Sequence, residues 1–430
     1  MVNSSVEELK KRIEELEIEN SKLKSQITQE QALPVEKAVA GDFLSLDEYK
    51  RYGRQMIVPQ ITKSGQRKIK ESKILVIGAG GLGCPALMYL VGAGIGEVGI
   101  VDDDVVDISN LHRQVLHSTE RVGEFKAESA KKYLVKLNPH VKIKTYPFRL
   151  STTNAFNIFE KYDLVLDCTD SPHSRYLISD VAVISRIPVI SGSGLKTEGQ
   201  LTVLNFENIG PCYRCFYPKP PPPNSVTSCK DGGVIGPIIG LMGVMMAIET
   251  LKVITGTYTK ENFKPFLSMY SGYDQQSFKT FKMRGRKLDC ISCNYTLTRE
   301  FIENGGINYS EFCGVVTYDV LNKDERITIE QYEKLRNSDH VLLDVRPKEH
   351  FEIVSFPGAI NIPLDRLRRI EDVNQLGIDI SKPIYTICRY GNDSQYASRY
   401  LNDHLKLSTK DVIGGLNRWS TKIDSEFPSY

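Results

Sequence analysis

A cysteine near the end of the chain stands where a strand, a glycine-containing loop and a helix are expected to meet. Residues 383–398 read PIYTICRYGNDSQYAS, so a β-type run ends at Cys388 and a helix-like stretch begins after the loop around Gly391. Such a unit directs backbone N–H groups and a helix N-terminus at the sulfur, and both stabilise an anion there. The pattern predicts a reactive thiolate at Cys388.

Four further cysteines form two CxxC pairs, Cys212 with Cys215 and Cys290 with Cys293. Two residues between ligands let one turn present both thiolates to a single ion, and four such sulfurs complete a tetrahedron around zinc. A closed site of this kind has no open coordination position, so the predicted zinc is structural. Two redox-active pairs, or disulfide pairing, are the alternative interpretations.

A glycine-rich turn is expected much earlier in the chain. The stretch KILVIGAGGLGCPALMYLVGAG places Gly78, Gly80 and Gly83 directly after a predicted strand and before a predicted helix. Glycines there allow a tight turn and a close approach of the backbone to phosphates at the helix N-terminus. Asp102 ends the next predicted strand, where a carboxylate can hold ribose hydroxyls. Taken alone, these features indicate an NAD- or FAD-dependent oxidoreductase.

Several charged residues around this turn favour a nucleoside triphosphate instead. Arg51 and Arg54 precede the first strand, and Arg113 and Lys126 follow Asp102 in the sequence. Hydride transfer does not require several cations, whereas a triphosphate under attack does. Asp170, at the end of a later strand, offers a carboxylate for Mg²⁺ on that triphosphate. Together these residues predict adenylyl transfer.

The motifs RYGRQ, GAGGLG, SNLHRQ and DCTDS, in this order, resemble the ubiquitin-activating superfamily, and in particular its MoeB and ThiF type, over residues 44–320. The resemblance implies that ATP is bound by Gly81, Asp102, Ser109, Asn110, Leu111, His112, Arg113, Lys126, Asp170 and Ser171. It also implies that Asp170 assists Mg-ATP and that Arg54 reaches the partner subunit's active site in a homodimer. The implied substrate is the C-terminal Gly-Gly carboxylate of a ubiquitin-fold protein, and the implied products are an acyl-adenylate and pyrophosphate.

Cys229 lies in a proline-rich loop, in the stretch TSCKDGGV, next to Lys230. A neighbouring cation lowers the pKa of a thiol. Eukaryotic members of the resembled superfamily place a thioester-forming or sulfur-relaying cysteine at this position, so the resemblance implies that role for Cys229. Without the resemblance, an incidental loop cysteine is the plainer interpretation.

The last part of the chain resembles a rhodanese domain over residues 327–430. The resemblance is carried by LLDVRPKEHFEIVSFPGAINIP together with the cysteine loop. Cysteine phosphatases place an arginine where this loop has Ser394, while here Arg389 directly follows the cysteine. The loop therefore suits a persulfide better than a phosphate. Asp344 and Arg346 match the structural motif of the family, and a hydrogen-bonded scaffold role is expected for them.

The amino-acid composition limits which class of protein carries these sites. The chain has 430 residues, 25% of them charged and 41% hydrophobic, with a formal net charge of +2. This predicts a soluble, cytoplasmic protein of two or three domains, with neither a nucleic acid nor a membrane as a direct partner. The apolar stretch at residues 234–248 is short for a membrane span and is expected to form a buried helix. Nine cysteines without a secretion signal indicate metal or thiol chemistry rather than a disulfide scaffold.

The elements that must position the sites alternate between strands and helices. The strand runs KILVIGAG, EVGIVDDD, YDLVLDCTD and IPVIS predict an α/β fold with a parallel, doubly wound, Rossmann-like sheet. A smaller α/β domain is expected after it. The predicted boundaries are residues 1–31 for an N-terminal amphipathic helix, 42–321 for the adenylation domain and 327–430 for the rhodanese domain.

The N-terminal helix carries a heptad pattern. Two series of residues repeat every seven positions. The first is Val6, Ile13, Asn20 and Ile27, and the second is Leu9, Leu16 and Leu23. This is the a/d seam of a short coiled coil, and a single Asn at an a position sets register. A dimerising or docking helix and a solvated, fraying helix are both consistent with it.

A fusion of these two domains resembles the eukaryotic adenylyltransferase–sulfurtransferases that activate a ubiquitin-related sulfur carrier for tRNA thiolation. The implied enzyme adenylates the Gly-Gly terminus of the carrier. It then delivers sulfur from a persulfide on Cys388, which an upstream donor has loaded, to form a thiocarboxylate for wobble-uridine 2-thiolation and for protein conjugation. The same chemistry on the small subunit of molybdopterin synthase is the alternative. An oxidoreductase, a phosphatase fused to a nucleotide-binding domain and a non-catalytic scaffold are the rival classes.

Overall fold

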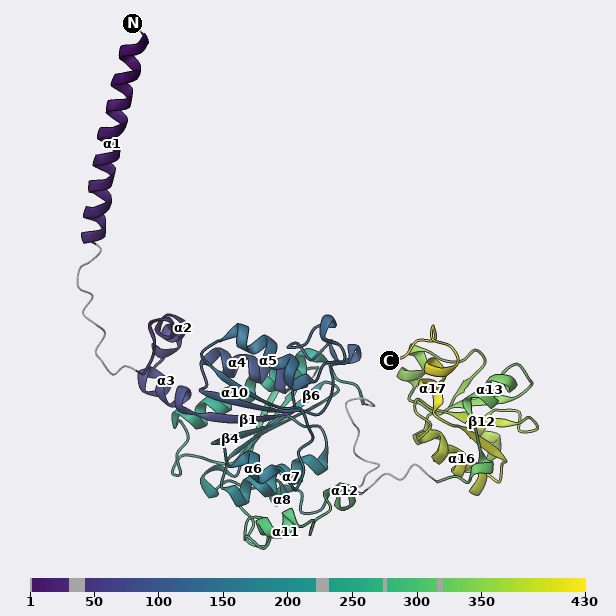
Figure 1. Cartoon of the computed structure of the whole chain (residues 1–430). Coiled ribbons are helices and arrows are strands. Elements are labelled where there is room, and N and C mark those ends of the chain that lie inside the picture. Colours follow the sequence, from purple (N-terminus) through teal and green to yellow (C-terminus); the bar gives the residue numbers. More distant parts are fainter. Residues whose placement is uncertain (1, 31–42, 222–231, 274–276, 315–319) are drawn as a thin grey trace. The chain divides into compact units, whose positions relative to one another are not determined.

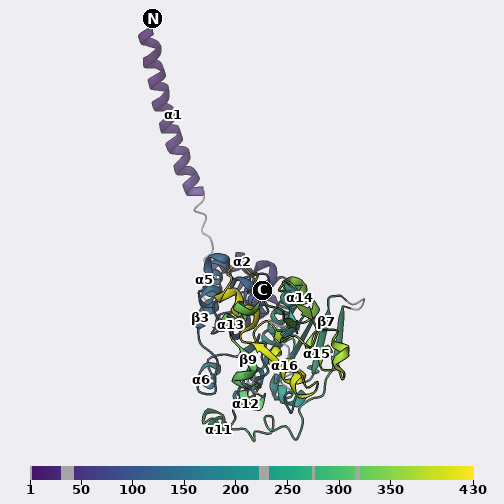
Figure 2. The same ribbon diagram turned by 90° about the vertical axis from the view of Figure 1, so that its right-hand side faces the viewer.

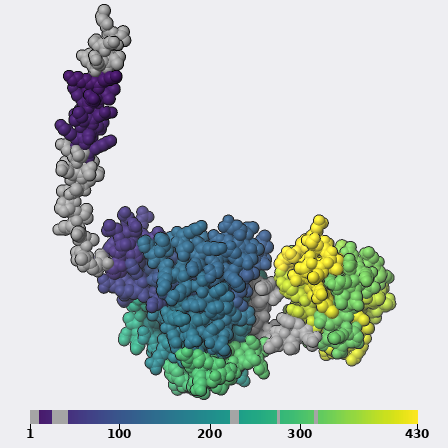
Figure 3. All heavy atoms as spheres, in the orientation of Figure 1, coloured from purple at the N-terminus to yellow at the C-terminus, as the bar shows by residue number. Residues whose placement is uncertain are grey.

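The computed structural model describes residues 2–30, 43–221, 232–273, 277–314 and 320–430 (Figure 1). They fall into two compact units. Of the described residues, the first unit contains 2–30, 43–216, 232–273 and 277–304, and the second contains 217–221, 305–314 and 320–430. Figure 3 shows the heavy atoms of residues 43–216 and of residues 320–430 closely packed, each within its own unit. The predicted domain boundaries stay predictions.

The first unit is organised around an eight-stranded sheet with the order β3-β2-β1-β4-β5-β6-β7-β8. Its strands are β1 (Lys73–Ile77), β2 (Glu97–Val101), β3 (Lys142–Tyr146), β4 (Leu164–Asp167), β5 (Val189–Leu195), β6 (Glu198–Leu204), β7 (Phe266–Ser271) and β8 (Phe278–Lys282). The four strand runs predicted from the sequence are confirmed as β1, β2, β4 and β5. Together with β3 they pair in parallel.

The predicted parallel, doubly wound sheet is confirmed for the first five strands, but the last three strands do not pair in parallel. β6, β7 and β8 pair antiparallel, so the sheet is mixed. The connection between β5 and β6 is a tight hairpin in which Lys196 has a φ of 54°. A turn this short forces the chain to reverse, whereas a parallel pair requires a long crossover.

Helices cover both faces of this sheet, as in a doubly wound fold. The helices of the unit's globular part are α2 (Leu46–Met56), α3 (Thr62–Glu71), α4 (Gly83–Ala93), α5 (Lys126–Leu137), α6 (Ala155–Phe159), α7 (Pro172–Ser185), α8 (Tyr213–Phe216), α10 (Gly236–Thr255) and α11 (Arg299–Glu303). Figure 1 shows α4, α5 and α10 on one face and α6, α7 and α8 on the other.

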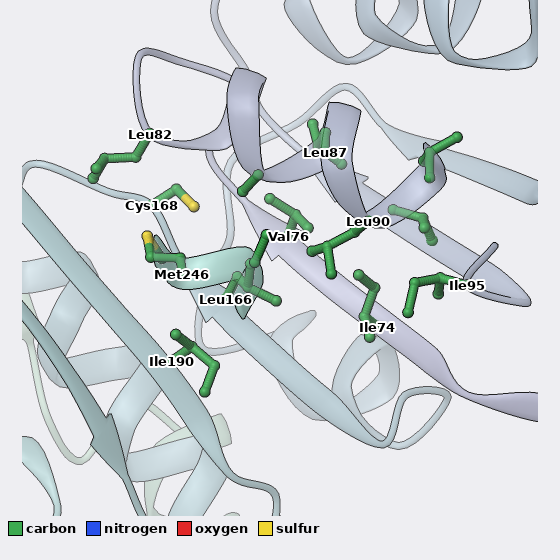
Figure 4. Packing of buried hydrophobic residues seen from close by; sticks show 14 of the residues in the cluster. Ile74, Val76, Leu82, Leu87, Leu90, Ile95, Leu166, Cys168, Ile190 and Met246 are labelled. Atoms are coloured by element: carbon green, nitrogen blue, oxygen red, sulfur yellow. The ribbon is translucent and has the colours of Figure 1, made fainter. Parts of the chain in front are cut away.

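The core lies between the central strands and the first of these helix layers. Side chains of β1, β4, α4 and α10 meet there, and Figure 4 shows Ile74, Val76, Leu90, Leu166 and Met246 as members of one cluster. Each of these side chains is fully or almost fully buried. Burying a large apolar side chain stabilises the fold by about 1.5–3 kcal/mol. The packing therefore holds the carboxyl ends of β1 and β4 in place.

The predicted buried helix is confirmed as α10, which is longer than expected. By length and composition it could cross a membrane, with a mean hydropathy of 1.8. Instead, Ile238, Ile239, Met242 and Met246 are buried, and the helix packs against α4, β5 and β6. It is a core helix of the first unit.

The second unit contains a five-stranded sheet with the order β11-β10-β12-β13-β9, and all of its pairs are parallel. Its strands are β9 (Arg326–Ile327), β10 (Val341–Asp344), β11 (Ile360–Asn361), β12 (Ile384–Ile387) and β13 (Thr409–Val412). Its helices are α12 (Tyr309–Phe312), α13 (Ile329–Leu335), α14 (Lys348–Ile353), α15 (Leu364–Leu367), α16 (Asp393–Asp403) and α17 (Gly415–Lys422). The predicted smaller α/β domain is confirmed.

The predicted N-terminal helix is present as α1 (Val2–Glu30). It is a single unbroken helix in both views (Figures 1 and 2).

Candidate functional site

The glycine-rich turn follows β1 at the point where the strand order reverses, with β2 on one side of β1 and β4 on the other. Gly78 has a φ of 101°, and a Cβ there would lie 2.8 Å from the carbonyl oxygen of Cys168. A Cβ on Gly83 would lie 1.9 Å from the carbonyl oxygen of Gly78. Only glycine fits both positions, which leaves the backbone of the turn open to a ligand at the N-terminus of α4.

Asp102 is held beside this turn. One of its carboxylate oxygens accepts a 2.7 Å hydrogen bond from the N–H of Ala79, and the other accepts a 2.9 Å bond from the N–H of Asp104. Burial raises the pKa of Asp102, and the charge of Lys126 opposes that rise. The fold therefore brings the predicted ribose-binding carboxylate to the glycine turn.

The predicted segment Ser109–Arg113 forms a short capped turn after β2. The N–H of Ser109 donates to the carboxylate of Asp107, which caps the 3₁₀-helix Ile108–Asn110. Arg113 donates a 2.6 Å hydrogen bond to the side-chain oxygen of Asn110, and its guanidinium also lies 2.6 Å from Nε2 of His112. These contacts fix the cation of Arg113 within its own segment. Leu111 ends the 3₁₀-helix.

Lys126 opens α5 and is buried, with its ammonium 2.8 Å from a carboxylate oxygen of Asp104. Asp170 and Ser171 follow β4 and precede α7, and the carboxylate of Asp170 is exposed. Ser171 donates a 2.8 Å hydrogen bond to the hydroxyl of Ser174. The loop that follows β4 contacts the glycine turn through Cys168. One edge of the sheet therefore brings together this loop, Asp102 and residues 78–83.

Two predicted catalytic residues are not part of this cluster in the described residues. Arg54 is exposed on α2, and its predicted role in a partner subunit's active site stays a prediction. Cys229 lies outside the described residues. Gly81, the remaining predicted ATP contact, is in the glycine turn, where a Cβ would meet the side chain of Ile239 at 3.0 Å.

The four CxxC cysteines come together as a buried cluster. Their sulfurs all lie within 4.8 Å of one another. Sulfur–sulfur distances are 3.7 Å for Cys212 and Cys215, 3.5 Å for Cys212 and Cys290, and 3.7 Å for Cys215 and Cys293. A tetrahedron with Zn–S bonds of about 2.3 Å has edges of about 3.8 Å. The donor set fits a four-thiolate zinc site and joins segments that are far apart in the sequence.

Contacts within and around the cluster lower the pKa of Cys215 and Cys290 and raise the pKa of Cys212 and Cys293. The backbone N–H of Lys287 lies 3.4 Å from the sulfur of Cys215 and donates to it. The hydrogen bond with Cys212, helped by that with Cys293, lowers the pKa of Cys290 to about 6. Arg214 and Asp180 form a buried ion pair at 2.8 Å, which anchors α8 to α7.

Cys388 has the predicted geometry in the second unit. It follows β12, and its sulfur accepts hydrogen bonds of 3.2 Å from the N–H groups of both Gly391 and Asn392. Burial raises the pKa of the Cys388 thiol, while the contacts with Ser394 and the backbone N–H groups act in the opposite direction. The two N–H groups form an amide cradle around the sulfur, but burial has the larger effect on the pKa. This thiol therefore ionises less readily than an exposed cysteine.

Two residues beneath Cys388 extend its hydrogen bonds into the core. The hydroxyl oxygen of Ser394 lies 3.3 Å from the sulfur. Ser394 donates a 2.6 Å hydrogen bond to Asp411 on β13, and the guanidinium of Arg326 donates to the other oxygen of Asp411 at 2.7 Å. Burial raises the pKa of Asp411. Sequence reasoning missed Asp411. An acidic residue inside the apolar strand run of "KDVIGG" was the available signal.

Arg389 lies against two aromatic rings. Its guanidinium lies 4.3 Å from the ring centre of Tyr430 and 5.0 Å from that of Tyr390. A cation over an aromatic face gains about 0.5–2 kcal/mol. Arg389 therefore packs against Tyr390 and Tyr430.

Asp344 and Arg346 form a buried ion pair at the end of β10. Arg346 also donates to the carbonyl oxygens of His350 and Val354 and to the hydroxyl of Tyr430. Its charge is thus compensated on all sides, and these are the contacts of a structural ion pair.

Two other cysteines are buried in the core of the first unit. Burial raises the pKa of Cys84 to about 12 and holds that of Cys168 well above its ordinary value. Both are packing residues, as expected from the sequence.

Comparisons with known proteins agree with this organisation. The ThiF family model matches residues 52–292, and the rhodanese-like domain model matches residues 328–422. A crystal structure of Escherichia coli MccB with MccA-N7isoASN shares the fold of the first unit. It has a TM-score of 0.50 at 21% identity, and the match covers 58% of this chain and 75% of that one. The fold and sites thus define an adenylating domain of the ThiF family followed by a rhodanese-like domain.

Relatives match along the entire chain. The adenylyltransferase and sulfurtransferase UBA4 of Scheffersomyces stipitis is 56% identical over 440 residues, covering 100% of this chain and 99% of the relative. The proteins of the same description from Meyerozyma guilliermondii and Saccharomyces cerevisiae are 57% and 54% identical and cover 97% and 99% of this chain. The chain belongs to the UBA4 family of adenylyltransferases and sulfurtransferases.

Proposed function

We propose that this enzyme adenylates the C-terminal glycine of a ubiquitin-like sulfur carrier and converts it to a thiocarboxylate for wobble-uridine 2-thiolation of tRNA. One observation carries the proposal. A single chain holds a glycine turn with an adjacent ribose-type carboxylate, Asp102, and an amide-cradled cysteine, Cys388. The first site activates a carbonyl, and the second holds the sulfur that attacks it.

The adenylation step uses the edge of the sheet at β1, β2 and β4. The turn at residues 78–83 receives the phosphates of ATP, and Asp102 holds the ribose. Arg113 and Lys126 offset the phosphate charge, and Asp170 holds the Mg²⁺ that accompanies ATP. A carboxylate oxygen of the carrier attacks the α-phosphorus, the bond to the β-phosphate breaks, and pyrophosphate leaves. In a homodimer, Arg54 of the partner subunit adds a further positive charge.

The sulfur step uses two cysteines. Cys229 displaces AMP from the acyl-adenylate and forms a thioester. The outer sulfur of a persulfide on Cys388, loaded by an upstream persulfide donor, attacks that carbonyl and releases the Cys229 thiolate. Cys229 then attacks the inner sulfur of the acyl disulfide. The S–S bond breaks, the carrier leaves as a thiocarboxylate, and the resulting Cys229–Cys388 disulfide requires a dithiol reductant before the next cycle.

The zinc is assigned a structural role. Cys212, Cys215, Cys290 and Cys293 would hold it, and when bound it ties α8 to the segment after β8. We further propose that the enzyme works in the cytoplasm.

A substitution at Cys388 separates the two steps. Cys388→Ala should retain ATP–pyrophosphate exchange that depends on a Gly-Gly carrier, and it should form no thiocarboxylate by mass spectrometry. Cys313→Ala is the matched control, because Cys313 lies outside both sites, and it should behave as the unaltered enzyme. Undiminished thiocarboxylate formation by Cys388→Ala would overturn the sulfur-transfer assignment. If the unaltered enzyme shows no ATP–pyrophosphate exchange with any Gly-Gly carrier, the adenylation assignment is overturned.

A further inference from the structure

Helix α1 carries an apolar stripe that a single helix does not bury. Ile13, Leu16 and Leu23 are 56%, 47% and 50% exposed. They share one face of α1 with Asn20, and Glu17 and Lys24 border it. Ile13 and Asn20 are seven residues apart, as are Leu16 and Leu23, so the stripe follows the a and d positions of a heptad repeat.

The charged residues that flank the stripe identify the partner. With Ile13 and Asn20 at a, Arg12 and Glu19 occupy g positions, and Glu17 and Lys24 occupy e positions. In a parallel, in-register pair, each g residue of one helix faces the e residue five positions later on the other helix. Arg12 then faces Glu17, and Glu19 faces Lys24. Both contacts join opposite charges, and twofold symmetry makes each contact occur twice.

Asn20 selects among the remaining arrangements. In a parallel, in-register pair the two copies of Asn20 face each other and can exchange side-chain hydrogen bonds. A slip of one heptad would place Asn20 against an isoleucine, and an antiparallel pair would place it against a leucine at a d position. Either arrangement would leave a buried amide without a hydrogen-bond partner, which disfavours it. Leu at d with Asn at one a position also favours two strands over three.

We propose that α1 pairs with α1 of a second copy of this chain as a parallel, in-register, two-stranded coiled coil. Three heptads are marginal for an isolated helix pair. Any second contact between two copies raises the effective concentration of one helix near the other and so favours the pairing. The inference uses only residues of α1 and does not depend on the proposed reaction.

Cysteine cross-linking in the full-length chain tests the geometry. Leu16→Cys places a thiol at a d position, where the two copies lie side by side, while Ile18→Cys places one at an f position on the outer face. We expect Leu16→Cys to give a disulfide-linked dimer under mild oxidation at least about tenfold faster than Ile18→Cys, with the unaltered chain as the baseline. Equal rates for the two variants would overturn the proposal.

Charge reversal tests the register, and it is measured as the cross-linking rate in the Leu16→Cys background. Arg12→Glu sets two like charges against each other twice per dimer, and we expect it to slow cross-linking about tenfold. Adding Glu17→Arg should restore the rate. Arg12 also contacts Glu15 within its own helix at 3.1 Å, so Glu15→Gln is the matched control and should leave the rate unchanged. Failure of the double variant to recover would overturn the assigned register.

Discussion

Ser394 donates a 2.6 Å hydrogen bond to the carboxylate of Asp411, and both side chains are fully buried. The oxygen of the same hydroxyl also lies 3.3 Å from the sulfur of Cys388. Cys388 is therefore connected through Ser394 to a buried acid that lies on a different strand.

Replacing Ser394 should weaken the second unit. Ser394→Ala removes the hydrogen bond to Asp411 and leaves only Arg326 to compensate that carboxylate, so we expect a loss of about 1–3 kcal/mol in the free energy of unfolding. Trp419 is the sole tryptophan of the chain and is buried in this unit, so its fluorescence during urea unfolding reports the change. Ser381→Ala, in an exposed turn, is the control and should stay within about 0.5 kcal/mol. Equal effects of the two substitutions would contradict the role of this contact.

Asp411 should make stability depend on pH in a defined direction. Burial raises its pKa in the folded protein above the ordinary value of 3.8. The folded state thus favours the neutral acid, and the stability it contributes is complete below the unfolded pKa and is lost as the pH rises through the folded pKa.

Asp411→Asn removes this ionisation. The stability of the unaltered protein minus that of Asp411→Asn should therefore fall as the pH rises from about 4 through the raised pKa, and then level off. Trp419 fluorescence in urea, repeated across this pH range for both proteins, measures the difference. A difference that stays constant or grows with pH would show that the pKa is not raised.

Loss of one zinc ligand should destabilise the first unit. Cys290→Ser breaks the closed tetrahedron, so we expect the bound zinc to fall from one ion per chain to none and the unit to lose about 4 kcal/mol or more. Elemental analysis counts the metal, and amide hydrogen exchange across α7 and α8 follows the loosening. Cys313→Ser, outside the cluster, should change neither reading. Retention of zinc by Cys290→Ser would argue against a four-cysteine site.

Two glycines of α4 allow a matched test of the nucleotide turn. A Cβ on Gly83 would lie 1.9 Å from the carbonyl oxygen of Gly78, whereas a Cβ on Gly92 would meet nothing within 4 Å. We expect Gly83→Ala to displace the turn, to destabilise the unit by about 1–3 kcal/mol and to reduce ATP–pyrophosphate exchange at least about tenfold. Gly92→Ala should be neutral or stabilising by up to about 1 kcal/mol. Exchange that is equally unaffected in both variants would place ATP elsewhere.

Patterns that span only a few neighbouring residues predict structure from the sequence alone. A CxxC spacing is local, and so is a strand run that ends in a glycine turn, because each depends on residues within one or two turns of the chain. For that reason β1, β2, β4, β5, α1 and α10 were all predicted, as were the cysteines of the metal cluster. The antiparallel strands β6, β7 and β8 were not, since pairing direction depends on the turns and crossovers that connect strands and not on strand composition.

The sequence by itself determined the α/β architecture, the glycine turn and the four cysteines that gather for a metal, since hydrophobic period and ligand spacing are written in neighbouring residues. Only the tertiary structure decided that Ser394 and Asp411 lie beneath Cys388, and that burial raises the pKa of that cysteine despite its amide cradle. The physical reason is that burial and hydrogen-bond partners depend on which strands lie side by side. That arrangement is a property of the packed sheet and not of any single stretch of the chain.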